Sequence, residues 1–259
     1  MIKTALVVIP TYNEAENIAE ILEAIRSVPT KAAIEVLVVD SNSPDGTGQK
    51  LEKMKENFPG LLVLHQPRKM GLGRAYLDGF QFFREKFPGR YDAVITMDAD
   101  FSHHPRYLSQ MLEGLEQSDL VVGSRYVDGG RLENWPAGRK LLSRFANAYG
   151  KALTGVGLND LTSGFHCFRT AVLLRVLQEN IKAEGYAFLI ELKYRTASNG
   201  FKIQEIPIVF ADRTKGDSKI SKKVILESAL AVLRILVQRL FRKAPTPSGM
   251  GPPSITQSG

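Results

Sequence analysis

Residues 93–100 read Ala-Val-Ile-Thr-Met-Asp-Ala-Asp, an apolar run that ends in two aspartates with one alanine between them. A continuous run of this kind is typical of a strand buried on both faces of a parallel sheet. Aspartates two positions apart at the end of an extended strand point to the same side, where they repel unless a cation lies between them and a substrate. Hard oxygen ligands favour Mg²⁺ or Mn²⁺ shared with phosphate oxygens. The stretch therefore predicts a central strand and a divalent-metal site at Asp98 and Asp100.

The sequence on either side of this stretch alternates between further strands and helices. Four more apolar runs have the length of a strand: Ala5–Ile9, Ile34–Val39, Leu61–Leu64 and Leu120–Val122. Between the five runs lie four patterns with helical spacing: Ala15–Ser27, Thr47–Glu56, Gly73–Lys86 and Arg106–Gln117. This alternation predicts an α/β fold with a mostly parallel central sheet flanked by helices. Ligands of such sheets bind beyond the carboxyl ends of the strands.

The second half of the chain is less regular. We expect a loop over Gly129–Pro136, a helix from Lys140 to about Leu153, a polar turn over Asp160–His166 and a strand over Ile203–Phe210. Residues 244–259 carry no charge and hold four prolines and three glycines. That composition predicts a flexible tail, because it offers too little apolar surface for a core.

The composition is that of a globular protein and excludes a disordered, collagen-like or disulfide-stapled chain. Hydrophobic residues make up 44% and charged residues 24% of the 259 residues, a size near the upper end for one domain. The single cysteine, Cys167, cannot form a disulfide within the chain, which fits a reducing cytosol. We find no apolar stretch long enough for a signal peptide or a membrane-spanning helix, so we expect a protein that does not cross a membrane unaided.

The positive charge is concentrated near the carboxyl end. Residues 212–243 hold nine basic and three acidic residues, which accounts for +6 of the net charge of +7. This excess suits a polyanion or an anionic membrane surface, although a merely solvated face has the same composition. A helical wheel of residues 222–243 has one apolar and one basic face. Such an amphipathic helix either lies on a membrane surface or packs on the core or on a membrane subunit.

Polar residues also follow the first and second predicted strands. Residues 10–14 (Pro-Thr-Tyr-Asn-Glu) either contribute to a ligand pocket or only begin a helix, with Thr11 or Asn13 as its cap. After the second strand, Asp40 is well placed to accept hydrogen bonds from a base or a ribose. Asp45, in contrast, is explained as part of a β-turn and a helix cap.

The order of these motifs is specific, although each is short. Pro-Thr-Tyr-Asn-Glu (10–14), Asp-x-x-Ser-Pro-Asp-Gly-Thr (40–47), Gly-Leu-Gly (71–73), Asp-Ala-Asp (98–100) and Gly-Ser-Arg-Tyr (123–126) follow the five strands in turn. Glu-Asn-Trp-Pro (133–136), Ser-Gly-Phe (163–165) and Arg-x-x-Gly-x-Ser-Lys (213–219) extend the series. From about Lys3 to Lys222 the sequence resembles the inverting GT-A glycosyltransferases of family 2. Within them it is similar to the dolichyl- or polyprenyl-phosphate mannosyltransferases.

The resemblance implies roles for particular residues. The nucleotide pocket would be lined by Pro10, Tyr12, Glu14, Val39, Asp40 and Ser41. The metal and the sugar diphosphate would be held by Asp98, Ala99 and Asp100. The acceptor phosphate would be gripped by Arg125 and Arg139, and a loop bearing Arg213 and Lys219 would close over the phosphates. Three positions depart from the family pattern, and one of them is Leu189, where the family usually has a glutamine. Ser41 replaces a second aspartate, and Ser102 stands where some members have a glutamine ligand.

The implied reaction is the transfer of mannose from GDP-mannose to the phosphate of a polyprenyl phosphate, with Mg²⁺ or Mn²⁺ and without nucleic acid. Three alternatives stay open: a polyprenyl-phosphate glucosyltransferase that uses UDP-glucose, a transferase to sugar hydroxyls, and a non-catalytic module that binds nucleotide sugars. We expect a GT-A catalytic domain over 1–221, the amphipathic helix over 222–243 and the tail over 244–259. The expected location is the cytoplasmic face of a membrane, with a possible membrane-anchoring subunit.

Overall fold

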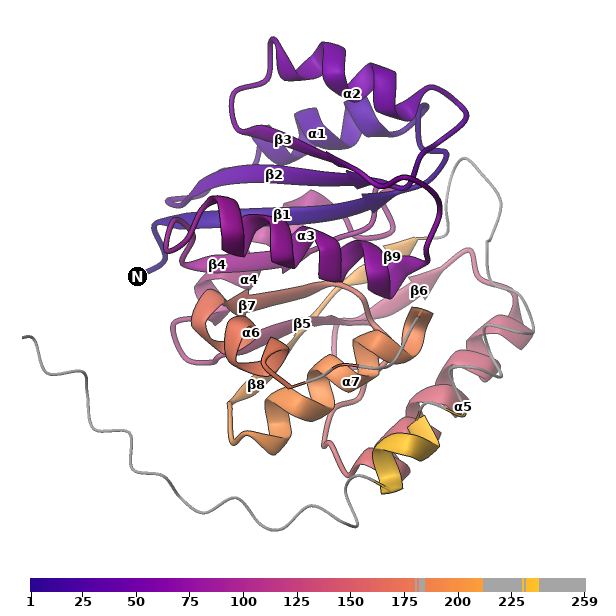
Figure 1. Cartoon of the computed structure of the whole chain (residues 1–259). Coiled ribbons are helices and arrows are strands. Elements are labelled where there is room, and N and C mark those ends of the chain that lie inside the picture. The colour runs from indigo at the N-terminus through magenta and orange to yellow at the C-terminus, as the bar shows by residue number, and fades with distance from the viewer. Residues whose placement is uncertain (180, 182–184, 212–229, 231, 238–259) are drawn as a thin grey trace, which may run out of the picture.

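A central sheet of seven strands organises the computed structural model, which describes residues 1–179, 181, 185–211, 230 and 232–237 (Figure 1). The strands of this sheet are β1 (Thr4–Thr11), β2 (Ala33–Asp40), β3 (Leu61–His65), β4 (Ala93–Thr96), β5 (Leu120–Ser124), β7 (His166–Arg169) and β8 (Ile203–Pro207). Across the sheet their order is β3-β2-β1-β4-β7-β5-β8, and every pair except those of β7 is parallel. This arrangement confirms the predicted mostly parallel α/β sheet.

Helices cover both faces of the sheet, because side chains of each strand alternate between two hydrophobic clusters. In β1, Ala5, Val7 and Ile9 belong to one cluster, whereas Leu6 and Val8 belong to the other. The first cluster is covered by α1 (Ile18–Arg26), α2 (Thr47–Lys55) and α4 (Leu108–Gly114), which a short 3₁₀ helix, Pro105–Tyr107, precedes. The second is covered by α3 (Leu72–Lys86), α6 (Thr170–Leu177) and α7 (Gly185–Ser198), which lie in front of the sheet in Figure 1.

The antiparallel strand β7 corrects one prediction. His166, expected at the end of a polar turn, begins this strand, whose residues pair with β4 on one side and β5 on the other. Its first three residues are fully buried, so the strand lies in the middle of the core. Because β7 runs opposite to its neighbours, the loop before it reaches the edge where β4 and β5 end.

The predicted strand Ile203–Phe210 is divided between two sheets. β8 ends at Pro207, and β9 (Val209–Ala211) pairs in parallel with β6 (Arg131–Glu133), a strand inside the segment predicted as a loop. Ile208 joins the two, because its N–H donates to the carbonyl of Ser124 and its carbonyl accepts from the N–H of Arg131. The strand divides because its residues pair with β5 up to Pro207 and with β6 from Val209 onward, and each buried backbone group needs a hydrogen-bond partner.

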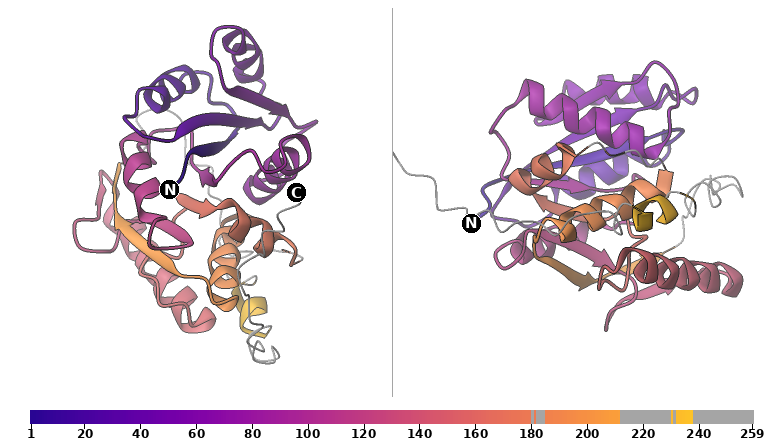
Figure 2. Two further views of the ribbon diagram at one scale, coloured as in Figure 1. Left: turned by 90° about the vertical axis from the view of Figure 1, so that its left-hand side faces the viewer. Right: turned by 60° about the horizontal axis from the view of Figure 1, so that its bottom comes forward.

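The helix α5 (Ala137–Thr154) begins three residues before the predicted start (Figures 1 and 2). Tyr149 and Leu153, near its carboxyl end, pack against the second hydrophobic cluster. The buried residues of α5 are Asn147, Gly150 and Thr154, whereas Leu141 and Phe145 are 70% and 65% exposed. The helices α6 and α7 are not part of the sequence-based prediction, while the predicted helices 15–27 and 106–117 are shorter in the structure.

Near the carboxyl end the structure describes Leu230 and residues 232–237, which are helical. Val232 and Ile235 are buried in the second cluster, while Leu230, Leu233 and Val237 remain exposed. The rest of the predicted amphipathic helix, the tail 244–259, and both Arg213 and Lys219 lie outside the described residues. None of the helices in the described part of the chain has the length and hydropathy needed to cross a membrane.

Candidate functional site

Two adjoining cavities lie at the edge where β1, β2, β4 and β5 end. We call the first the strand-end cavity; its lining residues are Pro10, Thr11, Tyr12, Glu14, Ser41, Lys69, Gly71, Leu72, Ala75, Asp98, Ala99, Asp100 and Gly185. The second is the arginine cavity; it is lined by Leu72, Tyr76, Asp98, Asp100, Ser102, His103, Arg125, Trp135, Arg139, Thr162, Ser163, Gly164, Leu189 and Phe210. Asp98 and Asp100 line both. The aspartate pair therefore stands at the junction of the two cavities.

The geometry around the aspartate pair differs from an extended strand. β4 ends at Thr96, and the chain bends at residues 99 and 100, with Phe101 in the left-handed region at φ 61°. A bulky residue in that region is strained by about 1–3 kcal/mol and persists only where its surroundings hold it. Asp100 Oδ1 accepts hydrogen bonds from the N–H and the Oγ of Ser102, at 3.1 and 2.5 Å. These bonds fix the turn and the direction of the Asp100 carboxylate.

His103 supports the other aspartate through the backbone. The N–H of Asp98 donates to His103 Nδ1 at 3.0 Å, and the imidazole stacks on Phe165 with ring centroids 5.0 Å apart. Burial lowers the pKa of His103 despite the nearby carboxylates, so the ring is neutral with its proton on Nε2. His104 caps the 3₁₀ helix that follows, because its Nδ1 accepts a hydrogen bond from the N–H of Arg106. This cap lies at the start of the helix predicted over residues 106–117.

The residues present suit a divalent cation with oxygen ligands. The Asp98 side chain is 35% exposed, and both carboxylates line the cavities. His103 Nδ1 is engaged by the Asp98 amide and offers no lone pair to a metal. The described residues contain no group of three or more acidic, histidine or cysteine ligands, so phosphate oxygens and water would complete the shell. That division of ligands is the one Mg²⁺ and Mn²⁺ use with phosphorylated substrates.

Most residues predicted to bind a nucleotide sugar line the strand-end cavity. These are Pro10, Tyr12, Glu14, Ser41, Asp98, Ala99 and Asp100. The Lys69 ammonium, which the prediction did not include, lies 4.0 Å from the centroid of the Tyr12 ring. The strand-end cavity thus contains an aromatic ring, a cationic side chain and the aspartate pair.

Val39 and Asp40 do not line either cavity. Val39 packs in the second hydrophobic cluster. The buried Asp40 carboxylate accepts from Thr11 Oγ1 at 3.1 Å and from Ser43 Oγ at 2.6 Å. Asp40 thus connects Thr11, which lines the strand-end cavity, to Ser43 in the loop after β2.

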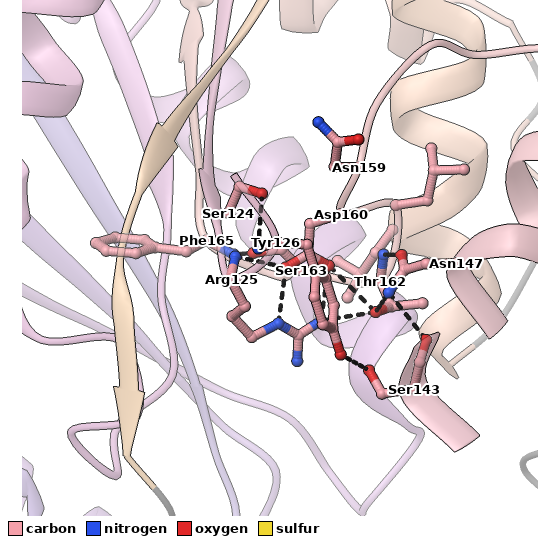
Figure 3. A network of polar contacts seen from close by, with 12 residues as sticks. Ser124, Arg125, Tyr126, Ser143, Asn147, Asn159, Asp160, Thr162, Ser163 and Phe165 are labelled. Carbon is pink, nitrogen blue, oxygen red and sulfur yellow. Dashed lines mark hydrogen bonds and ion pairs between the residues drawn. The ribbon is translucent and has the colours of Figure 1, made fainter. Parts of the chain in front are cut away.

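Arg125 is held by a buried network at the end of β5 (Figure 3). Its Nε and Nη2 each donate to the Asp160 carboxylate at 2.7 Å, and Nη2 also donates to Thr162 Oγ1 at 2.6 Å. The side chains are 6% exposed for Arg125 and 0% for Asp160. Burial alone would raise the pKa of Asp160, but the charge and hydrogen bonds of Arg125 outweigh it and lower the pKa. The pair is therefore ionised, and it fixes the direction of the guanidinium fork.

The loop that carries Asp160 is anchored from three sides. Glu205 on β8 accepts the N–H groups of Asn159 and Asp160, at 2.8 and 2.9 Å. Asn147 on α5 accepts the N–H of Thr162 at 3.1 Å. The buried Lys193 Nζ on α7 donates to the carbonyls of residues 161 and 163, at 2.9 and 2.7 Å. Three elements thus hold in place the loop that orients Arg125.

Lys193 leads to a prediction about pH. Burial lowers its pKa to about 7, although Asp160 acts in the opposite direction. Between pH 7 and the usual lysine pKa the unfolded chain binds more protons, so stability should rise with pH through this window. We expect the wild type to gain about 2 kcal/mol of unfolding free energy relative to Lys193→Met between pH 7 and pH 9. Urea unfolding of both proteins at the two pH values measures this, and an unchanged difference would contradict a lowered pKa.

Arg139 lies in the first turn of α5, where its Cζ is 3.8 Å from the centroid of the Trp135 ring. Arg125 Cζ lies 5.7 Å from the same ring, so both arginines predicted to bind the acceptor phosphate meet at one indole. Sequence reasoning missed Asp160, His103 and Trp135 as site residues. Their signals were an acid in the polar turn before Ser163, a histidine after the aspartate pair, and the sole tryptophan of the chain.

The sequence of this chain is similar to those of known proteins. The model of the family described as glycosyl transferase family 2 matches residues 6–177. An undecaprenyl-phosphate mannosyltransferase of Micrococcus luteus is 39% identical over 229 residues, which cover 88% of this chain and 92% of that protein. A polyprenol monophosphomannose synthase of Mycolicibacterium smegmatis is 41% identical over 229 residues, covering 88% and 84% of the two chains.

A solved structure resembles the fold at lower identity. Glucosyl-3-phosphoglycerate synthase from Mycobacterium tuberculosis, in complex with Mn²⁺, UDP and glucosyl-3-phosphoglycerate, has a TM-score of 0.62 and 20% sequence identity. The match covers 92% of this chain and 80% of that chain. At this identity the likeness concerns the fold alone, and it confirms the predicted GT-A architecture.

Proposed function

Because this chain belongs to glycosyl transferase family 2 and is a glycosyltransferase, we propose that it transfers mannose from GDP-mannose to the phosphate of a polyprenyl phosphate. The observation that carries the proposal is the junction of the aspartate pair with the arginine cavity. A nucleotide diphosphate needs a cation and its oxygen ligands, whereas a phosphate acceptor needs guanidinium groups a short distance away. The names of the two relatives support a prenyl phosphate as that acceptor.

On the donor side, we assign the nucleotide to the strand-end cavity. Tyr12 and Lys69 would contact its polar groups, and Asp98 and Asp100 would hold Mg²⁺ or Mn²⁺ against the diphosphate. The bound cation would neutralise charge on the departing nucleoside diphosphate. Ser102 and His103 keep the two aspartates in place, so this corner needs little rearrangement when the donor binds.

On the acceptor side, Arg125 and Arg139 would bind the lipid phosphate and direct one of its oxygens at the anomeric carbon. A phosphomonoester has its second pKa near 6 and is mostly a dianion at pH 7. Its oxygen is already deprotonated, so no side chain has to act as a general base. The new bond joins this oxygen to the anomeric carbon, while the bond from that carbon to the nucleoside diphosphate breaks, with inversion.

The exposed face of α5 offers a route for the lipid to reach the site. Leu141, Leu142 and Phe145 share one side of the helix, and Lys140 and Arg144 are their neighbours in sequence. An apolar face beside basic residues suits the headgroup region of an anionic bilayer. Arg139 in the first turn of the same helix lines the arginine cavity. We therefore place α5 against the cytoplasmic face of the membrane that holds the acceptor.

This placement predicts that the triple variant Leu141→Ser, Leu142→Ser, Phe145→Ser loses vesicle binding. Losing the burial of three apolar side chains should weaken binding by about 10²-fold. The measurement is flotation with liposomes that contain anionic lipid. The comparison variant is Leu230→Ser, Leu233→Ser, Val237→Ser, which removes three exposed apolar residues from the other candidate membrane segment, 222–243. If only the comparison variant lost binding, the membrane contact would lie on that segment and not on α5.

The transfer assay tests the function itself. The full-length protein is incubated with a prenyl phosphate, Mg²⁺ or Mn²⁺, and radiolabelled GDP-mannose or UDP-glucose in parallel. We expect label from GDP-mannose in the organic-extractable lipid. Label from UDP-glucose instead would identify a glucosyltransferase, and label only in water-soluble glycans would identify a transferase to sugar hydroxyls. Binding of both donors without any transfer would indicate a non-catalytic module that binds nucleotide sugars.

A further inference from the structure

Trp135 is one of the residues that line the arginine cavity, and the sequence alone predicts no role for it. It follows β6, and Phe210 of the paired strand β9 packs edge-on against it, with ring centroids 5.6 Å apart at 87°. Phe210 also packs edge-on against His103, at 5.6 Å. A continuous row of rings therefore joins Trp135 to the imidazole that supports Asp98, and the indole has little freedom to move.

Both arginines of the cavity use this indole. The Arg139 guanidinium lies over the ring at 3.8 Å, and that of Arg125 lies at 5.7 Å. A guanidinium stacked on an aromatic face keeps its N–H groups in its own plane, where they remain able to bind a phosphate bidentately. The ring thus limits the orientation of Arg139 without using the hydrogen bonds that an anion would need.

The polar atom of the indole plays no part in these contacts. Trp135 Nε1 is buried and has no hydrogen-bond partner among the residues that the structure describes. The contacts of Trp135 with the two guanidinium groups therefore use its ring and not its N–H. A phenyl ring should accordingly replace the indole with little loss, whereas an aliphatic side chain should not.

We propose that Trp135 is a positioning residue that holds Arg139, next to the Arg125 side chain that Asp160 already orients, in the orientation that binds the acceptor phosphate. This rests on the proposed function, which assigns the acceptor to the arginine cavity. Trp135 acts through the arginines and needs no contact with the reacting atoms. Its loss should therefore weaken acceptor binding and leave the donor side unchanged.

The first experiment uses the fact that Trp135 is the only tryptophan of the chain. The full-length protein is titrated with a short-chain prenyl phosphate in the absence of donor, while tryptophan emission is followed. The phosphate would bind to the Arg139 guanidinium that stacks on the indole, so we expect a saturable change in tryptophan emission. The corresponding prenol, which has no phosphate, should cause no such change. Saturable binding of the prenyl phosphate, measured by equilibrium dialysis, without any change in emission would overturn the proposal.

The second experiment separates KM from kcat. We expect Trp135→Leu to raise the acceptor KM about tenfold, since it removes a partly desolvated cation–π contact, and to leave the donor KM unchanged. Trp135→Phe should stay within about twofold of the wild type, because phenyl faces also bind guanidinium groups. The matched control is Phe87→Leu, which removes a ring at the opposite end of α3 from the cavities and should change neither constant.

The results distinguish this inference from the proposed function. If Trp135→Leu does not fold, Trp135→Phe carries the test: an acceptor KM raised about tenfold in that variant would mean that the indole N–H binds the ligand, and would overturn a role through the ring face. A wild-type acceptor KM in a folded Trp135→Leu would also overturn it, although mannosyl transfer would stand. A wild type that transfers no mannose but shows the saturable emission change would refute the function and retain the phosphate-binding role of this cavity.

Discussion

Asp100→Asn is expected to reduce mannosyl transfer by about 10³-fold, because it removes one of the two carboxylates that would hold the divalent cation. Asparagine has the same shape and can still accept the hydrogen bonds from Ser102, so the turn should keep its structure. The loss would then reflect charge and not misfolding. Initial rates of label transfer, measured across a range of Mn²⁺ and Mg²⁺ concentrations, test this, and excess Mn²⁺ should restore part of the rate.

The matched control is Asp92→Asn. Asp92 precedes β4, at the opposite end of this strand from the site, where its carboxylate accepts from the N–H groups of Lys3 and Thr4. We expect transfer by this variant to equal that of the wild type. Near-normal turnover by Asp100→Asn, with divalent cations removed by a chelator, would show that the aspartate pair has another role and that the leaving group is stabilised elsewhere.

Arg125→Met should be the most destabilising single substitution at the site. It leaves the fully buried Asp160 carboxylate without its guanidinium partner, which costs about 3–5 kcal/mol of unfolding free energy. The double variant Arg125→Met, Asp160→Leu removes both charges and should recover most of that stability. Transfer should stay lost in both variants, because each lacks one of the two guanidinium groups that would bind the acceptor phosphate.

Urea unfolding at pH 7 measures these differences, and transfer is assayed on the same preparations. The control is Arg131→Met, which breaks an exposed ion pair with Glu133 and should cost less than about 1 kcal/mol. If Arg125→Met unfolded at the same urea concentration as the wild type, the Asp160 carboxylate would have found another partner. If the double variant kept its activity, Arg125 would have no part in acceptor binding.

The predictable part of the fold consists of elements that local pattern specifies. β1, β2, β4 and β5 are continuous apolar runs, and their order with intervening helices is enough to indicate a parallel sheet. β7 could not be predicted in this way, because it has only four residues, His-Cys-Phe-Arg. It forms a strand through pairing with β4 and β5, which are distant in sequence. The division of β8 from β9 depends in the same way on partners at Ser124 and Arg131.

The site residues likewise divide into those that local sequence predicts and those that depend on distant contacts. The aspartate pair follows its strand directly, so its position at the sheet edge is a consequence of local sequence. Asp160 lies 35 residues after Arg125, and no spacing rule connects them. The position of Asp40 illustrates a further limit, because a strand end predicts nearness to the ligand but not whether neighbours such as Ser43 already occupy the carboxylate.

The reversed direction of β7 has a consequence for how acceptor preference can change. The residues that we assign to the donor lie at the ends of three strands, β1, β2 and β4. The residues that orient Arg125, Asp160 and Thr162, come instead from one short contiguous loop that enters the same edge from the other direction. The side chains at these two positions can change without altering a strand of the sheet, while Glu205, Asn147 and Lys193 hold the backbone of the loop. A single inverted strand thus lets the residues that support Arg125 and the residues assigned to the donor arrive at one edge of the sheet from opposite chain directions.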